Sequence, residues 1–458
     1  MFSRRRSTWK RKSQRRPWLP IVLLLIGVPI GLELLTRLVV QLAGANDQLT
    51  TSPSGKTEIV DGYRLGFLSP DGQPYTALPE PGKLLANRNP LLSYNLHPKQ
   101  ESKFWNINDQ GFRDRDPVPV EKANGEVRIF VLGGSTAFGQ LNSNNQATFA
   151  EQLEKLLNDR VAAQRSKATG FQPAILPYRA DQVAEALALP PRIPEQTYRV
   201  VNAAVPGYTS GNELAMLMQQ VASYNPDMLV ILDSYPDLLL PSSQPGAEIP
   251  GLDALIQGER ENPVDQMAKS VGNWVGGLYI SRVIDRYILQ SQPPTEELAI
   301  ALNVMVPEIK QPLDQLLTSD PKELNQRVTR YRNHLKQIVQ WGVGNRKRVF
   351  VGLQPEITSR TADVITAEES AILAKLGSSY SERVKNGYTE IAKAAETVTK
   401  SSANAKLLNL YDLYATYKGQ AFQSPTSLTD DANKVLANKF FEAIVQQVAI
   451  EPKPFGGG

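Results

Sequence analysis

Short runs of apolar, mostly β-branched residues alternate along the chain with longer segments in which apolar residues recur at helical spacing. Five runs have the length and composition of buried strands: Val127–Leu132, Arg199–Ala203, Met228–Leu232, Val349–Leu353 and Leu407–Leu410. This alternation is typical of a parallel sheet, because a crossover between parallel strands needs a helix-length connection. The pattern therefore predicts an α/β protein, built as a three-layer α/β/α sandwich around a five-stranded parallel sheet.

The helical segments carry their own start signals. Thr148 with Glu151, and Thr366 with Glu369, have the spacing of a capping box. The last helix is predicted over Asp430–Val448, with four side chains directed toward a core: Val435, Phe440, Phe441 and Ile444.

The chain divides by composition into segments of different character. The sequence predicts a basic cytoplasmic tail (1–17), a transmembrane helix (18–44), a loop-rich strap (45–125), one folded domain (126–450) and a flexible tail (451–458). The strap is rich in Pro, Gly, Asn and Asp and is not expected to fold alone. Two proline-bearing insertions, at about 160–196 and 241–325, interrupt the domain.

The amino-terminal segment has the features of a membrane anchor. No residue from Trp18 to Leu32 is charged, and the apolar character resumes after Glu33. Eight basic side chains precede the segment and account for the net charge of +4, so they indicate a positive-inside signal rather than nucleic-acid binding. A cleaved signal peptide ending near Ala43-Gly44-Ala45, or a buried soluble helix, are the alternatives. With the amino terminus in the cytoplasm, everything after about residue 45 is expected in the periplasm or an equivalent compartment.

The composition restricts the chemistry that the chain can perform. The 458 residues include no cysteine and two histidines, His97 and His334. Disulfides, thiolate metal sites and cysteine nucleophiles are therefore excluded, and imidazole chemistry is limited to two positions. The sequence implies no metal and no organic cofactor.

A serine follows the first predicted strand of the domain in the turn Gly133-Gly134-Ser135-Thr136. The carboxyl ends of strands are where open α/β sheets usually place their sites, and glycines permit a tight turn there. Ser135 is thus a candidate nucleophile, or a donor through its N–H. The alternative is a Gly-Ser turn that caps the next helix.

Several separate segments of the chain resemble the SGNH or GDSL-like hydrolases of the membrane-anchored bacterial type. The resemblance rests on five ordered blocks between about 108 and 448: Asn108 to Arg113, Gly133 to Thr136, Asn202 to Tyr208, Asp227 to Leu238 and Leu428 to Asn433. It implies a flavodoxin-like strand order, Ser135 at the nucleophile position and an oxyanion hole that includes the N–H of Gly207. Gly134, Thr136 and Tyr208 then become candidate binding residues, and Asp237 a weaker catalytic candidate.

Three positions depart from the family pattern. Pro236 stands where the family has an asparagine that donates to the oxyanion, and Ser424 and Ser427 stand where it has the aspartate and the histidine base. Proline has no N–H to donate, and a serine hydroxyl cannot act as the base. The catalytic set is therefore degenerate by this comparison.

Four other residues are candidates to replace the base, and each has an argument against it. His334 falls in a predicted helix, 328–341, that precedes the fourth strand, so its side chain is expected to start from the wrong end of the sheet. His97 belongs to the strap, which would have to fold over the site. Asp233 and Asp237 would need a raised pKa, and their simpler interpretation is a strand-end hydrogen bond or a helix cap.

Three functions are compatible with these features. The first is a membrane-tethered hydrolase-like domain that binds an envelope glycan, a lipid or a membrane-protein partner without efficient hydrolysis. The second is an active serine ester hydrolase or acyl transferase on cell-envelope glycans or lipids, with a rearranged catalytic set. The third is a purely structural assembly protein that uses the 241–325 insertion. Nucleic acid is not an expected partner.

Overall fold

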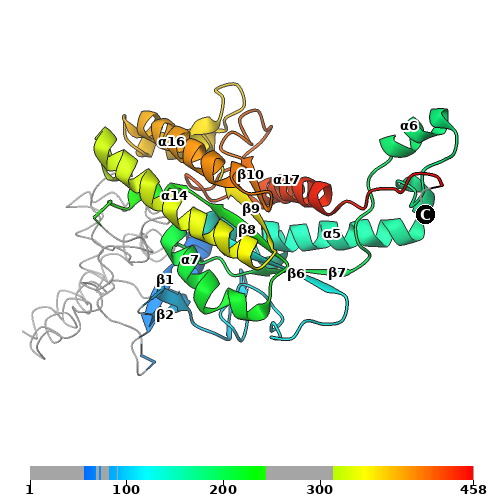
Figure 1. Ribbon diagram of the computed structural model, residues 1–458. Helices are drawn as coiled ribbons and strands as arrows, with labels where there is room; N and C mark the ends of the chain where they lie inside the picture. Colours follow the sequence, from blue (N-terminus) through cyan, green and yellow to red (C-terminus); the bar gives the residue numbers. More distant parts are fainter. Residues whose placement is uncertain (1–55, 69–71, 74–81, 90, 244–312, 457–458) are drawn as a thin grey trace, which may run out of the picture. The chain divides into compact units, whose positions relative to one another are not determined.

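The computed structural model describes residues 56–68, 72–73, 82–89, 91–243 and 313–456 (Figure 1). The predicted basic tail, the predicted transmembrane helix at 18–44 and most of the second insertion lie outside the described residues. Among the helices of the described ranges, none is long and apolar enough to cross a membrane.

A parallel five-stranded sheet lies at the centre of the domain. Its strands are β6 (Glu126–Gly133), β7 (Thr197–Asn202), β8 (Met228–Asp233), β9 (Arg348–Leu353) and β10 (Ala405–Asn409). Their order in space is β10-β9-β8-β6-β7, which in chain order is the flavodoxin-like 2-1-3-4-5 arrangement. The five predicted strands are confirmed, with ends that differ by one or two residues.

Helices of the described chain connect and cover these strands. Those after the strap are α4 (Ser135–Phe138), α5 (Phe149–Ser166), α6 (Ala180–Ala188), α7 (Ser210–Gln219), α8 (Tyr235–Leu239), α13 (Leu313–Leu316), α14 (Pro321–Gly344), α15 (Ala367–Lys375), α16 (Tyr380–Lys400) and α17 (Asp430–Val448). The last helix has the bounds that its pattern predicts. By contrast, α5 continues into the first predicted insertion, where Val161 and Gln164 are buried, and α14 begins within the second, at Pro321, with Asp320 as its N-cap.

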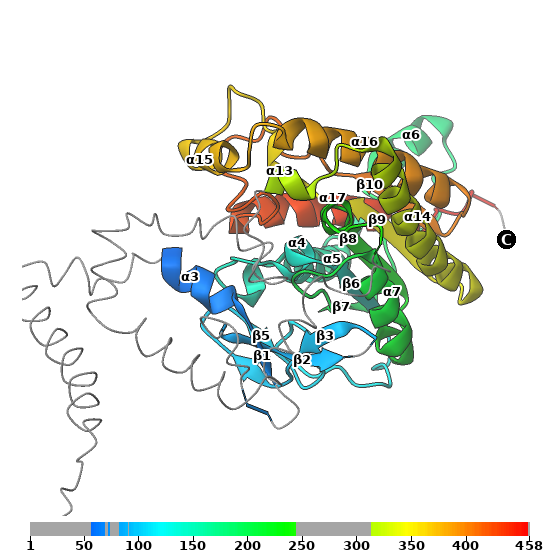
Figure 2. The ribbon, with the colours of Figure 1, turned by 90° about the vertical axis from the view of Figure 1, so that its left-hand side faces the viewer.

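Two residues of β9 show that helices cover both faces of the sheet. A Cβ placed on Gly352 would come within 2.6 Å of the Phe440 ring on α17, whereas a Cβ on Gly342 of α14 would come within 2.6 Å of Val349. Residues 349 and 352 are an odd number of positions apart, so they point to opposite faces of the strand. Thus α14 covers one face of the sheet and α17 the other, as Figures 1 and 2 show.

The predicted helix caps are present in two forms. Thr366 and Glu369 form the full capping box, each bonding the other's backbone N–H. Thr148 accepts from the N–H of Glu151 at 3.4 Å, which is half of the predicted box. Both threonines therefore satisfy backbone donors that an uncapped helix leaves open.

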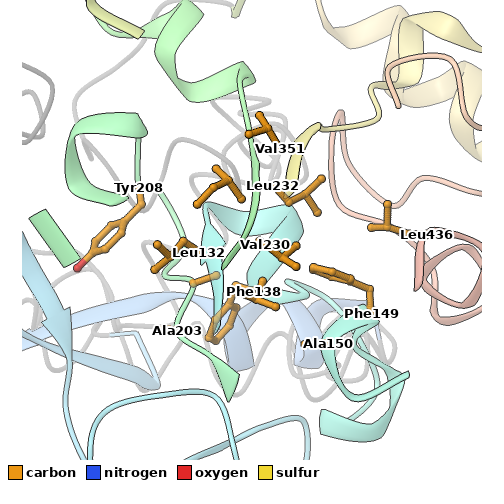
Figure 3. Close-up of a cluster of buried hydrophobic side chains, with 14 of the residues drawn as sticks. Leu132, Phe138, Phe149, Ala150, Ala203, Tyr208, Val230, Leu232, Val351 and Leu436 are labelled. Atoms are coloured by element: carbon orange, nitrogen blue, oxygen red, sulfur yellow. The ribbon is translucent and has the colours of Figure 1, made fainter. Parts of the chain in front are cut away.

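A dense apolar core supports the turn after β6. Figure 3 shows Phe138, on the helix that begins with Ser135, among Leu132, Val230 and Phe149. The Phe138 and Phe149 side chains are fully buried. Burying an aromatic ring of this size contributes about 1.5–3 kcal/mol, so Phe138 anchors the short helix to the sheet.

The strap contains more regular structure than its composition predicts. It holds α3 (Lys56–Tyr63), a small sheet in the order β1-β2-β3 (Leu65–Leu68, Leu84–Asn89, Ser93–Leu96) and the pair β4 (Gln100–Glu101) and β5 (Asn106–Ile107). These strands are short and lack clear alternation, which is why periodicity did not reveal them. The Tyr94 hydroxyl donates to the Pro206 carbonyl, and the Asn212 amide donates to the Leu92 carbonyl at 2.9 Å, so the strap is bonded to the domain.

Candidate active site

Ser135 begins a single-turn helix directly after the central strand β6. Gly133, the last residue of the strand, has φ +154°, and a Cβ there would lie 2.3 Å from the Leu232 carbonyl oxygen. Only glycine fits this close approach of two backbones. The Ser135 side chain is 9% exposed at the point where the strand order reverses, between β6 and β8. This is the position at which open α/β sheets bind ligands.

The sequence blocks of the resemblance meet at this turn. A Cβ built on Gly134 would lie 3.0 Å from the Tyr208 carbonyl oxygen, 3.5 Å from the Pro236 ring and 4.0 Å from an Asp233 carboxyl oxygen. The Thr136 hydroxyl donates to the Thr426 carbonyl at 3.0 Å. Segments from β6, β7 and β8 and the loop before α17 therefore surround one small volume.

Two backbone N–H groups remain available near Ser135. The N–H of Ser135 lies in the first turn of α4, where a helix has no internal acceptor, and Gly207 has φ +85° in the neighbouring turn. Neither N–H has a hydrogen-bond acceptor among the described residues. The Tyr208 hydroxyl donates to the Tyr94 carbonyl, so the strap holds the Gly207 turn in place. Pro236 contributes no donor.

The Ser135 hydroxyl has no base beside it. Within the described ranges it makes no hydrogen bond to an imidazole or a carboxylate, and only the Ser135 carbonyl is bonded, to Gly139 and Gln140. An unassisted hydroxyl is a weak nucleophile at neutral pH.

The two serines at the family's aspartate and histidine positions are buried beside the turn. Ser424 Oγ accepts from the N–H of Ser427 at 2.9 Å, which stabilises the loop that Thr136 contacts. Ser427 Oγ is buried and has no hydrogen-bond partner in the described part of the chain. The loop therefore keeps its place in the fold but presents hydroxyl groups instead of a carboxylate and an imidazole.

The two histidines bond elsewhere. The His97 ring pairs with the Asn87 side chain in the strap, with Nδ1 3.1 Å from the amide nitrogen and 3.2 Å from the amide oxygen. His334 Nδ1 lies 3.0 Å from Ser210 Oγ, at the start of α7. Because α7 follows β7, His334 reaches the carboxyl edge of the sheet. The expectation that it starts from the wrong end is wrong, since α14 is long enough for its middle to pass this edge.

Asp237 binds the first turn of α7. Its carboxylate accepts from the Ser210 N–H at 2.9 Å and from the Ser210 hydroxyl at 2.6 Å. Ser210 thus lies between Asp237 and His334, whereas in a hydrolytic triad the imidazole lies between the other two groups. Since Ser210 is buried and donates to a carboxylate, this arrangement is a helix cap supplied by another element.

A buried carboxyl pair, one member of which the sequence did not single out, lies behind the turn. Burial raises the pKa of Glu213 to about 8, and burial together with the neighbouring Glu213 raises the pKa of Asp233 well above its usual value. An Asp233 carboxyl oxygen lies 4.0 Å from a Cβ built on Gly134, and the raised pKa favours the protonated form of this group. Neither Asp233 carboxyl oxygen bonds the Ser135 hydroxyl in the described part of the chain, so Asp233 does not take the place of a base there.

A second buried network, also absent from the sequence prediction, supports the block that contains Pro236. The Tyr235 and Tyr380 hydroxyls are 2.9 Å apart, and Tyr380 donates to Glu356 at 3.0 Å. Burial raises the pKa of Glu356 to about 7. Because these contacts join residues far apart in sequence, no local signal predicts them.

Arg113 of the strap fixes the far end of the Ser135 helix. Its fully buried guanidinium donates to the carbonyls of Phe138 (2.9 Å) and Gly139 (2.6 Å) and to the Tyr63 hydroxyl (2.7 Å). The last carbonyls of a helix have no internal donors, and Arg113 supplies them. The Asn108-to-Arg113 motif therefore positions the site from outside the domain.

Two cavities of the described chain lie apart from Ser135. Two cavities of about 590 and 530 Å³ are lined by residues of α14 and α16 and by the loops after β9 and β10. Ser135 lines neither of these two cavities. In the described residues no group of three histidine or acidic side chains is placed to hold a metal ion.

Comparisons with known proteins give similarity of fold. No family model matches the sequence, and no curated protein matches it. Among solved structures, the acetyl xylan esterase AlAXEase is 10% identical (69% of this chain, all of that one, TM-score 0.33). A lipase/acylhydrolase from Enterococcus faecalis is 15% identical (71% and 98%, TM-score 0.34), and a GDSL-like lipase from Bacteroides thetaiotaomicron is 8% identical (70% and 88%, TM-score 0.30).

These three structures are an esterase, a lipase/acylhydrolase and a GDSL-like lipase by their descriptions. At identities of 8–15% and TM-scores of 0.30–0.34, the similarity assigns no role to any residue of this chain. The site is therefore interpreted from its own geometry.

Proposed function

We propose that the chain is a membrane-tethered, extracytoplasmic protein with an SGNH hydrolase-like domain that binds a ligand or a protein partner and does not hydrolyse esters efficiently. The ligand class is an envelope glycan or lipid, or a membrane protein of the same compartment. The supporting observation is the Ser135 hydroxyl, which has no imidazole or carboxylate within hydrogen-bond distance in the described part of the chain.

The size of the expected catalytic defect follows from the missing groups. Removing the histidine of a triad costs on the order of 10⁶ in turnover in a serine protease and leaves about 10³–10⁴ over water. Losing one oxyanion donor, as Pro236 implies, costs about another 10²–10³. Together these losses leave little acceleration beyond what binding alone provides.

The hydrolysis of p-nitrophenyl acetate by the purified full-length protein tests the catalytic part of this proposal. We expect a rate close to that of buffer, and the same rate for Ser135→Ala and for the control Ser166→Ala on the α5 surface. A wild-type rate well above buffer that Ser135→Ala alone abolishes would favour the active hydrolase instead.

Thiol labelling tests the tether and the compartment separately. Because the natural chain has no cysteine, each introduced cysteine is the single thiol of the protein. Leu91 is 65% exposed in the strap, so a Leu91→Cys variant carries one accessible thiol. A membrane-impermeant maleimide should label Leu91→Cys in intact spheroplasts, and Ser13→Cys in the basic tail only after permeabilisation. The reverse pattern would contradict the proposed orientation.

A further inference from the structure

Two segments form an arm that projects from the domain. The arm consists of residues 167–196, which include α6, and residues 449–456 near the carboxyl terminus. Backbone hydrogen bonds join the two segments: Leu176 N–H to the Lys453 carbonyl (2.8 Å), Lys453 N–H to the Ala174 carbonyl (2.9 Å) and Ile450 N–H to the Arg192 carbonyl (2.8 Å). Figure 1 shows α6 and the carboxyl end standing away from the sheet and its helices. Within the tail that the sequence predicted as flexible, both backbone groups of Lys453 are thus hydrogen-bonded.

The arm carries most of the exposed large apolar side chains of the described chain. Five of the nine such residues lie on it: Ile175, Tyr178, Leu187, Ile450 and Phe455. Tyr178 is 79% exposed and Phe455 is 62% exposed, and their ring centroids are 5.2 Å apart, so the two segments share one apolar surface. A concentrated apolar surface on a soluble domain marks an interaction site.

The helix within the arm is too short to be stable without packing. α6 has nine residues, its N-cap residue Arg179 makes no side-chain capping bond, and Ala186 is its only fully buried residue. Isolated helices shorter than about 12–15 residues are marginal in water. Ala180, Val183, Ala184 and Leu187 share one face of α6 by their spacing, and that face is largely exposed. A partner that covers this face would stabilise the helix.

The charges of the arm favour a copy of itself as that partner. Its basic residues (Lys167, Arg179, Arg192, Lys453) equal its acidic residues (Asp181, Glu185, Glu195, Glu451) in number. Arg179 pairs with Asp181 at 2.9 Å and Arg192 with Glu195 at 2.8 Å. A two-fold interface places the same surface on both sides, so a charged surface would repel itself and a neutral apolar one does not.

A lipid surface fits the arm less well. Binding to anionic membranes uses an excess of basic residues, whereas the polar face of α6 carries Asp181 and Glu185. In Figure 2, α6 and the strap helix α3 lie on opposite sides of the domain.

We infer that the arm is the contact through which two copies of this chain associate, with the apolar surface around Tyr178, Leu187 and Phe455 buried between them. The arm is longer than the ~20–30 residues that a standard interface takes from each partner. The inference does not depend on the proposed function, because no residue of the arm belongs to the Ser135 site.

Cross-linking of single-cysteine variants of the full-length protein tests this inference. The natural chain has no cysteine, so Tyr178→Cys introduces the only thiol. The matched control is Val343→Cys, at a 49% exposed apolar position on α14 outside the arm. With copper phenanthroline as oxidant, Tyr178→Cys should form a disulfide-linked dimer and Val343→Cys should not. Adding Leu187→Asp to Tyr178→Cys should reduce the dimer about tenfold, since interface anchors are worth more than 1 kcal/mol.

Other outcomes overturn the inference. A dimer of equal yield at both positions would indicate random collision. If Tyr178→Cys formed no dimer and its thiol reacted with maleimide, the arm would be free on a monomer. If Tyr178→Cys formed no dimer and its thiol did not react, another segment or a different protein would cover the arm. A thermal melt of Leu187→Asp checks that this exposed substitution leaves the domain folded.

Discussion

The hydroxyl of Thr136 donates to the carbonyl of Thr426 at 3.0 Å, across 290 positions of sequence. This bond brings the loop that carries Ser424 and Ser427 to the Ser135 turn. The loop that the resemblance matches to the family's aspartate and histidine positions therefore lies beside Ser135, with serines at both positions. The loop lies next to the Ser135 turn, but it carries neither a carboxylate nor an imidazole at these two positions.

Restoring those side chains should restore part of the activity. We expect the triple variant Ser424→Asp, Ser427→His and Pro236→Asn to hydrolyse p-nitrophenyl acetate at least about 10²-fold faster than the natural chain, because each added group recovers part of the loss described for triads and oxyanion holes. Adding Ser135→Ala to the triple variant should remove the gain. Since Ser427 is buried, histidine there also costs about 1–3 kcal/mol of overpacking, which urea unfolding would measure.

Asp237 should matter for stability and not for ester hydrolysis. Asp237→Asn replaces an acceptor of the Ser210 N–H by an amide that competes as a donor, so the free energy of unfolding should fall by about 1–2 kcal/mol. Ser210→Ala, which keeps the bond to the N–H, should lose less. The exposed Asp412→Asn serves as the control. If Asp237→Asn abolished the hydrolysis gained by the triple variant while the stability stayed unchanged, Asp237 would instead have a catalytic role.

Arg113 should be essential for the stability of the Ser135 helix. Arg113→Met leaves the buried carbonyls of Phe138 and Gly139 without donors, and we expect the free energy of unfolding to fall by about 3 kcal/mol or more. Arg115, two residues away and exposed, is the matched control, and Arg115→Met should change the same quantity by less than about 0.5 kcal/mol. Urea unfolding followed by tryptophan fluorescence gives both values. Equal losses in the two variants would rule out a specific role of Arg113 at the end of the Ser135 helix.

The buried pair Glu213 and Asp233 should make stability fall as the pH rises. The pKa of Glu213 is raised to about 8 in the folded chain, against about 4.3 when unfolded, so the folded state holds a proton that the unfolded state releases. The stability that this extra proton provides is fully present below about pH 4 and is lost as the pH rises toward 8.

Glu213→Gln should therefore flatten the dependence of unfolding free energy on pH between 5 and 8.5, whereas Glu382→Gln on the exposed surface of α16 should leave it unchanged. Urea unfolding at several pH values measures both slopes. An unchanged slope in Glu213→Gln would mean that the Glu213 carboxyl group is ionised in the folded protein at neutral pH.

The sequence by itself determined the parallel sheet, its five strands and the last helix, Asp430–Val448. These follow from local properties: apolar runs of strand length, helical spacing and capping residues act over a few positions and are visible in one dimension. It also identified the three substituted positions, Pro236, Ser424 and Ser427, because a departure from a motif needs no coordinates.

The tertiary structure alone decided which groups meet. The contact of His334 with Ser210 depends on how far α14 extends past the sheet edge, and the pairing of Glu213 with Asp233 depends on how α7 packs beside β8. The hydrogen bonds of Arg113 to the Ser135 helix and the pairing of the two arm segments likewise join parts of the chain that are tens to hundreds of residues apart. Such contacts are fixed by the packing of whole elements, and no local pattern in the chain encodes them.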